Sequence, residues 1–112
     1  MPDFSEIIGA ELTSVEFVQD YLVLDFEDAS VTLYAWPSVL LEDGSFAFRE
    51  PGYRDALCEQ IGQDVVQALL EEGAALTIEF ESGIVFGLSL REEDLLAPQA
   101  GSFTINGEMV EF

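Results

Sequence analysis

The sequence predicts a single α+β domain over residues 1–112, mostly antiparallel β, built from two repeated α-β-β-β units and a C-terminal β-hairpin. Three observations predict this class. The length suits one domain. Residues 4–36 resemble residues 57–90, and an Asn-Gly pair separates two alternating apolar runs within residues 102–112, which is a strong hairpin signal. We expect six to eight strands in all.

The internal repeat appears when residues 4–9 are placed over residues 57–62. With one residue inserted, residues 22–31 then lie over residues 76–85. The identical pairs are Glu6/Glu59, Ile8/Ile61, Gly9/Gly62, Leu22/Leu76, Phe26/Phe80, Glu27/Glu81 and Val31/Val85. Each half can therefore be used to interpret the other.

A short helix is predicted before each set of strands. Residues 51–62 predict a helix of about three turns, because Tyr53, Leu57 and Ile61 form one apolar stripe and Gly62 suits a C-terminal cap. Residues 2–8 predict a weaker equivalent with Phe4 and Ile8 turned inward.

The segment 63–73 is ambiguous by itself. Its apolar spacing is that of an amphipathic helix, but its counterpart at residues 11–20 is rich in β-branched and aromatic residues and alternates as a strand does. We therefore predict a strand in both places.

Two three-stranded meanders follow from this assignment. Residues 21–27 and 75–81 alternate as half-buried strands, and residues 30–36 and 84–90 complete the meanders. We expect the meanders to pack on each other or to join in one curved sheet with the helices at the side. Residues 37–50, with proline, glycine and acidic residues, are expected to form a long loop containing a short extended piece at residues 45–48.

The charge excludes several classes of function. The chain has 23 acidic residues, three arginines, no lysine and no histidine, for a net charge of −20. Binding to nucleic acid or to an anionic membrane through phosphate neutralisation is therefore not expected. A single cysteine, Cys58, and the absence of a signal peptide or long apolar run predict a cytoplasmic protein.

The residue types also limit the possible chemistry. Without histidine and lysine there is no Ser-His or Cys-His dyad, histidine metal site or Schiff base, so we predict no catalytic residue, cofactor or metal. The acidic runs at 42–44, 71–72 and 92–94 lack the spacing of a calcium loop. Arg49 and Arg54 are interpreted as charge partners of nearby carboxylates at Glu50, Asp55 or Glu59.

Aromatic residues gather in the sequence around the predicted central loop. Together with the acidic turn they form the candidate partner-binding site, which comprises Tyr34, Trp36, Phe46, Phe48, Glu42 and Asp43. Aromatic rings in an acidic field suit a basic protein, which they contact through apolar anchors and cation–π interactions. The alternative is that the rings cover the open end of a small sheet.

The leading functional hypothesis is a non-enzymatic acidic protein that binds a basic protein partner, for example as an immunity protein that neutralises a toxin, or by mimicry of nucleic acid. The alternatives are a small enzyme or ligand-binding domain that uses buried carboxylates, and acidity that serves only solubility in high salt. Residues 15–26 and 52–58 resemble those of short acidic bacterial proteins of unknown function. This resemblance implies a bacterial origin and assigns no activity.

The charge predicts how stability responds to salt and pH. Mutual repulsion among the carboxylates is stronger in the folded chain than in the expanded one, so screening or protonation should stabilise the fold. In thermal denaturation, the midpoint should rise between low salt and about 0.5 M NaCl, and again as the pH falls from about 7.5 to about 5.5. Midpoints that stay flat or fall in both titrations would contradict a repulsive surface.

Overall fold

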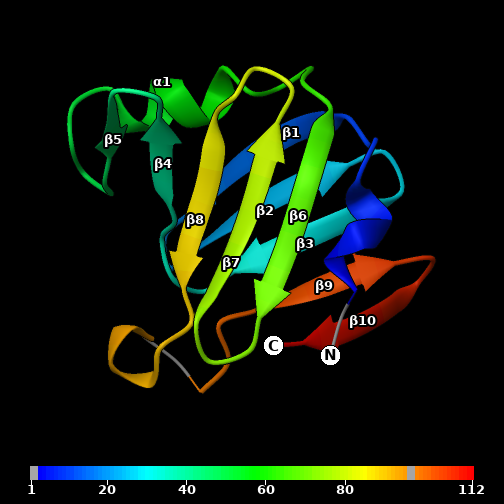
Figure 1. The fold of residues 1–112 in the computed structure, drawn as a ribbon. Helices are drawn as coiled ribbons and strands as arrows, with labels where there is room; N and C mark the ends of the chain where they lie inside the picture. The colour runs from blue at the N-terminus through cyan, green and yellow to red at the C-terminus, as the bar shows by residue number, and fades with distance from the viewer. Residues whose placement is uncertain (1–2, 96–97) are drawn as a thin grey trace.

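Two five-stranded antiparallel sheets and one short α-helix make up the computed structural model, which describes residues 3–95 and 98–112. The strand orders are β1-β2-β3-β9-β10 and β5-β4-β8-β7-β6. Figure 1 shows the second sheet lying across the first. The strands are β1 (Leu12–Val18), β2 (Tyr21–Phe26), β3 (Ala29–Leu33), β4 (Ser38–Leu41), β5 (Gly44–Phe46), β6 (Val65–Glu71), β7 (Ala75–Phe80), β8 (Val85–Ser89), β9 (Gly101–Ile105) and β10 (Glu108–Glu111).

The mostly antiparallel class predicted from the sequence is confirmed, although the described residues contain ten strands instead of six to eight. Both meanders are present, β1-β2-β3 in one sheet and β6-β7-β8 in the other. The strand predicted over the ambiguous segment is confirmed as β6. Leu22, Leu24 and Phe26 of β2 are buried, as are their counterparts in β7.

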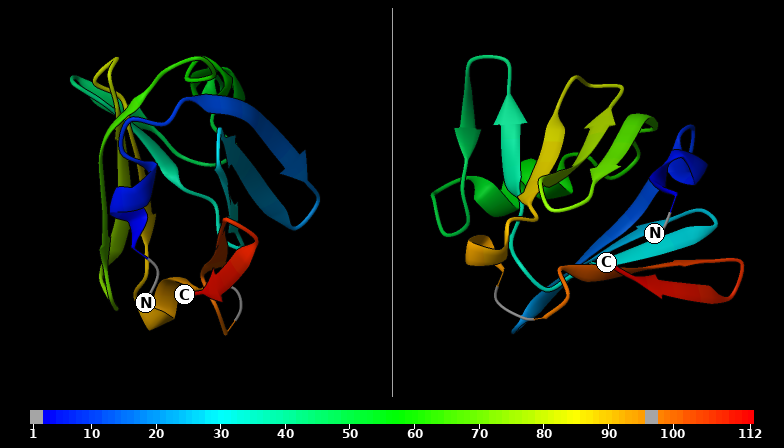
Figure 2. Two further views of the ribbon diagram at one scale, coloured as in Figure 1. Left: turned by 90° about the vertical axis from the view of Figure 1, so that its right-hand side faces the viewer. Right: turned by 60° about the horizontal axis from the view of Figure 1, so that its bottom comes forward.

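Each meander is followed by a hairpin that pairs with the opposite sheet. The hairpin β4–β5 follows β3 in the chain but pairs with β8, and the hairpin β9–β10 follows β8 but pairs with β3. The right-hand view of Figure 2 shows the two hairpins on different sheets. The C-terminal hairpin is confirmed, and its turn residues Asn106 and Gly107 have φ of 53° and 82°.

The long loop predicted over residues 37–50 is wrong, because residues 38–46 form the hairpin β4–β5. The acidic and glycine residues of the segment lie in or next to the turn of this hairpin, and such residues are also typical of loops. The segment forms a hairpin because β4 pairs with the edge of β8 and because Val39 of β4 is completely buried.

The two sheets are joined at one crossing, formed by residues 9–12 and 62–65. The Gly9 N–H donates to the Val65 carbonyl at 2.7 Å, and the Gly62 N–H donates to the Leu12 carbonyl at 2.8 Å. The Leu12 and Val65 N–H groups donate to residues 63 and 10 at 3.0 and 2.9 Å, so the four bonds are reciprocal. Both glycines have φ near 90°, a conformation that favours glycine.

The left-hand view of Figure 2 shows the two sheets facing each other, and the buried hydrophobic residues of both sheets form one core. Phe4 stacks on Phe103 with ring centroids 4.7 Å apart, and Phe80 meets Phe86 edge to face at 4.8 Å. Phe4 belongs to the 3₁₀ helix η1 (Phe4–Ile7). Residue 2, where the weaker helix was predicted to begin, lies outside the described residues.

The helix predictions need correction in length and in register. The helix α1 spans only Tyr53–Cys58, and although Tyr53 and Leu57 are buried, Ile61 is 43% exposed. Gln60 is buried in its place, and in η1 Ile7 is buried in place of Ile8. The helix ends at Cys58, so the four-residue helical spacing that places Tyr53 and Leu57 on one face does not continue to Ile61.

The buried amide of Gln60 gives the first stability test. Its Oε1 accepts from the Ser82 hydroxyl at 2.6 Å, and its Nε2 donates to the Ala56 carbonyl at 3.4 Å. Gln60→Ala leaves these groups without partners and should lower the free energy of unfolding by about 1–3 kcal/mol. Ile61→Ala, on the exposed neighbour, should cost under about 0.5 kcal/mol. Equal shifts of the urea midpoint in both variants would contradict this register.

Candidate functional site

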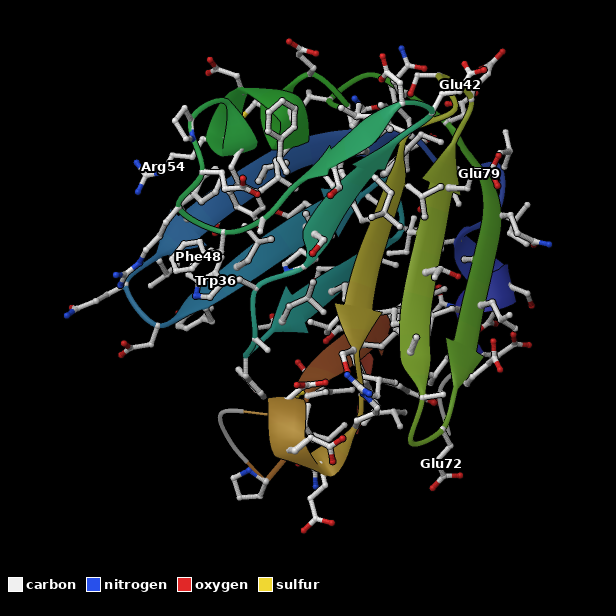
Figure 3. All side chains as sticks on the ribbon, turned by 60° about the vertical axis from the view of Figure 1, so that its left-hand side comes forward. Trp36, Glu42, Phe48, Arg54, Glu72 and Glu79 are labelled. Atoms are coloured by element: carbon white, nitrogen blue, oxygen red, sulfur yellow. The ribbon has the colours of Figure 1, made fainter. Side chains whose placement is uncertain are left out.

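Three aromatic rings from three parts of the chain form a stack at one side of the sandwich. Trp36 and Phe48 are parallel, with centroids 4.3 Å apart and planes at 1°. Phe17 of β1 lies on Trp36, with centroids 6.3 Å apart and planes at 13°. We call Phe17, Trp36 and Phe48 the aromatic stack. Figure 3 shows Trp36 and Phe48 side by side.

Two of the three arginines lie on this stack. The guanidinium carbon of Arg54 is 5.3 Å from the centroid of Phe17, and that of Arg49 is 5.3 Å from the centroid of Phe48. Both distances are within the range of a cation–π contact. In the part of the chain that the structure describes, the only ion pairs belong to Arg91. The prediction that Arg49 and Arg54 pair with nearby carboxylates is therefore wrong, because aromatic rings hold their guanidinium groups instead.

Tyr53 connects the aromatic stack to helix α1. Its ring meets Phe48 at 73° with centroids 5.9 Å apart, and its hydroxyl donates to the Pro37 carbonyl at 2.5 Å. Tyr53 is 2% exposed, and this burial raises the pKa of its phenol above the ordinary value. The first turn of α1 is thus tied to the segment that carries Trp36.

A shallow cavity of about 490 Å³ opens beside the stack. Its lining consists of Phe48, Arg49, Glu50, Gly52, Tyr53, Arg54 and Asp55, most of them exposed. Arg49 and Arg54 therefore both contribute to the lining of this cavity. The Glu50 Oε1 accepts a hydrogen bond from the Ala47 N–H at 2.5 Å, which holds the Glu50 side chain against the backbone of this segment.

The residues of the candidate partner-binding site are only partly brought together. Trp36 and Phe48 are in contact, and Phe46 lies against Gly52 at the rim of the cavity. Tyr34 is half-buried after β3 and belongs to no ring pair in the described residues. Glu42 and Asp43 form the turn between β4 and β5, and Figure 3 shows Glu42 at the far end from Trp36.

Phe17 is a member of the site that the sequence does not predict, and the two arginines have a different role from the predicted one. Phe17 is visible in the sequence only as an apolar residue in an alternating strand, which indicates a core position. Its contact with Trp36 depends on how β1 lies relative to the segment after β3. Nothing local in the sequence signals that contact.

Four acidic residues are neighbours at the crossing of the two sheets. Glu11 and Asp64 face each other in an isolated antiparallel bridge, the Glu27 Oε1 accepts from the Glu11 N–H at 2.9 Å, and the Glu81 N–H donates to the Asp64 carbonyl at 2.9 Å. We call Glu11, Glu27, Asp64 and Glu81 the acidic end. Ile8 and Ile61, 42% and 43% exposed, lie in the two turns that lead into the crossing.

Most of the acidic residues lie in turns and loops at the margins of the sheets. Within strands there are only Glu16, Asp25, Glu71, Glu79, Glu108 and Glu111. The hydroxyl of Ser89 and the side chain of Arg91 hold the pKa of Asp94 below its ordinary value. In the described residues the buried polar side chains are Gln60 and Ser102, and no group of three or more carboxylate or cysteine ligands is placed to hold a metal.

Comparison with known proteins found no match: neither a family model, nor a curated protein, nor a solved structure is similar to this chain. The resemblance to short acidic bacterial proteins therefore stays a prediction. Among the described residues, no helix has the length and apolar character needed to cross a membrane.

The hydroxyl of Tyr53 gives the second stability test. Tyr53→Phe keeps the ring but leaves the Pro37 carbonyl without its donor in a buried site, so it should lower the free energy of unfolding by about 1–3 kcal/mol. Tyr34→Phe is the matched control, because no hydrogen bond of the Tyr34 hydroxyl is present among the described residues, and should cost under about 0.5 kcal/mol. Chemical denaturation measures both, and equal costs would show that the Tyr53 hydroxyl bond contributes nothing.

Proposed function

We propose that this chain is a non-enzymatic binding protein whose acidic end engages a basic protein partner. The observation that carries the proposal is the acidic end itself, where four acidic residues from four segments are neighbours through backbone contacts, and no ion pair joins them to an arginine in the described residues. The arginines are placed elsewhere. A negative patch of this kind attracts a positive surface and speeds its association.

Apolar residues beside the acidic end support a protein partner over a small cation. Ile8 and Ile61 are large, exposed and adjacent to the crossing, and such side chains supply the contact area on which protein interfaces depend. The turn that holds Glu42 and Asp43 extends the negative surface. A toxin-neutralising immunity protein in the cytoplasm of a bacterium is the concrete form of this proposal.

We also infer that residues 4–36 and 57–90 are two copies of one α-β-β-β unit. The same order of elements in both segments supports this, as do strand irregularities at Leu12/Ser14 and at Val65/Gln67. The reciprocal hydrogen bonds of the crossing are those expected between two copies related by a twofold axis. On this reading the acidic end lies on the axis, and Glu27 and Glu81 are equivalent residues.

Neutralising the acidic end tests the proposed function. The chain is immobilised and exposed to lysate of its source cell at low salt, with wild type compared against a variant carrying Glu11→Gln, Glu27→Gln, Asp64→Asn and Glu81→Gln. The wild-type chain should retain a basic protein. The variant should retain at least about tenfold less of it, because each lost charge contact weakens the complex. The wild-type complex should also dissociate as salt is raised.

The control variant carries the same number of neutralised carboxylates away from the acidic end, namely Glu71→Gln, Glu72→Gln, Glu92→Gln and Glu111→Gln. It should retain the partner as wild type does. An equal loss in both variants would mean that net charge alone governs binding. Retention of no basic protein by wild type would favour the reading that acidity serves only solubility.

A further inference from the structure

We propose that Asn106 is a site of spontaneous covalent modification, at which deamidation in the folded chain produces aspartate or isoaspartate. The isoaspartate product releases β10 from its sheet, whereas the aspartate product leaves β10 in place. The site is the turn between β9 and β10, and the inference does not depend on a binding partner. Water is the only other reactant.

The turn of the C-terminal hairpin selects the residues that react. Ile105 pairs with Glu108, so Asn106 and Gly107 alone connect the two strands. Their φ values of 53° and 82° are those of a two-residue turn in which both positions adopt the left-handed conformation. Asparagine, aspartate and glycine are the residues favoured there. The hairpin geometry therefore places an asparagine directly before a glycine.

The reaction starts at the Gly107 nitrogen, which attacks Cγ of the Asn106 side chain. The new N–Cγ bond closes a five-membered succinimide ring, and the Cγ–Nδ2 bond breaks. The proton of the Gly107 N–H passes through solvent to the leaving nitrogen, which departs as ammonia. Water then opens the ring. Its attack on Cγ gives aspartate, and its attack on the main-chain carbonyl carbon gives isoaspartate, whose main chain continues through Cγ.

The described part of the chain does not obstruct this attack. Asn106 and Gly107 are both exposed, and a Cβ added at Gly107 would meet no atom within 4 Å. Among the described residues, no hydrogen bond uses the Gly107 N–H or the Asn106 side chain. Because glycine has no Cβ, its own residue does not shield the attacking nitrogen either.

Asn106 is the only asparagine of the chain, so the loss of one amide can be assigned to it. Glutamine side chains would have to close a six-membered ring, which is slower. Asp43 also precedes a glycine, in the turn between β4 and β5, and could close the same five-membered ring by losing water. An ionised carboxylate resists attack by nitrogen, so we expect Asn106 to react first.

The two products differ in the length of the main chain. Aspartate leaves the backbone unchanged, and Asp-Gly suits the same turn. Isoaspartate adds the Cβ methylene to the main chain, so the connection no longer matches the register that the turn sets. β10 lies at the edge of its sheet with β9 as its one neighbour, and its residues are exposed (Figure 1). Little else holds β10 once the turn is altered.

Release of β10 also reaches the core through Phe112, the residue that follows it. The Ala100 N–H donates to the Phe112 carbonyl at 2.6 Å, and the Phe112 N–H donates to the Gly101 carbonyl at 3.0 Å. The Phe112 ring meets Phe4 edge to face, with centroids 5.4 Å apart. A change of register in β10 displaces all three contacts.

Ageing of the folded chain tests whether Asn106 reacts. Wild type is incubated in mildly alkaline buffer without denaturant, and intact mass and peptide mapping follow the amide. The mass should rise by the exchange of one NH₂ for OH, with aspartate and isoaspartate both found at residue 106. Asn106→Gly is the matched control, because Gly-Gly suits the same turn and carries no amide, and its mass should stay constant.

Hydrogen exchange of the separated products tests the structural consequence. Amides of β10 and of Phe112 should exchange at least about tenfold faster in the isoaspartate form than in wild type, because exchange reports local opening. Amides of β3 should keep their protection. Freshly purified Asn106→Asp reproduces the aspartate product, and its β10 should exchange as slowly as that of wild type.

Three results would overturn the proposal. The first is a folded chain that keeps its amide over a period in which the chain unfolded in urea loses it, because the turn would then protect Asn106. The second is an equal gain of mass in Asn106→Gly, and the third is an isoaspartate form whose β10 exchanges as slowly as that of wild type. None of these measurements involves the acidic end, so this proposal and the proposed function fail separately.

Discussion

The fold depends on the crossing, where residues 9–12 and 62–65 exchange four reciprocal backbone hydrogen bonds. These bonds satisfy backbone groups at the points where each helical segment ends and each meander begins, so neither sheet can shift without exposing unpaired groups of the other. The positive φ of Gly9 and Gly62 permits the turn into each strand. The same crossing brings Glu11 next to Asp64 and with them the rest of the acidic end.

The exchange of hairpins between sheets builds the opposite side of the molecule. After β3 the chain leaves the first sheet and joins the second as β4, and Trp36 lies in that connection. Phe17 reaches it from the first sheet and Phe48 from the segment after β5, while Tyr53 ties the connection to α1. The aromatic stack therefore forms only where both sheets and the helix meet.

Charge is segregated between these two regions. At physiological salt, charges separated by more than about 8 Å are largely screened, so each surface acts through its own groups and less through the net charge of −20. No ion pair joins the acidic end to an arginine in the described residues, whereas Arg49 and Arg54 lie on the rings of the aromatic stack.

The amino-acid sequence alone was enough to predict the antiparallel β class, the position of both meanders and the C-terminal hairpin. These features rest on local signals, namely period-two alternation and the Asn-Gly turn. For β6 the apolar spacing is that of a helix, and the strand was predicted from the matching segment at residues 11–20. Local signals failed at Gln60 and Ile61, where a helix predicted to run on to Gly62 ends after Cys58.

Tertiary structure alone decided the pairing of β4 with β8, the contact of Phe17 with Trp36 and the placement of the arginines on rings. Gly101 is a further example, since any side chain there would collide with the Thr32 carbonyl of the neighbouring strand. In each case the partners are far apart in the chain. Their meeting depends on which sheet edges are free, which no local pattern records.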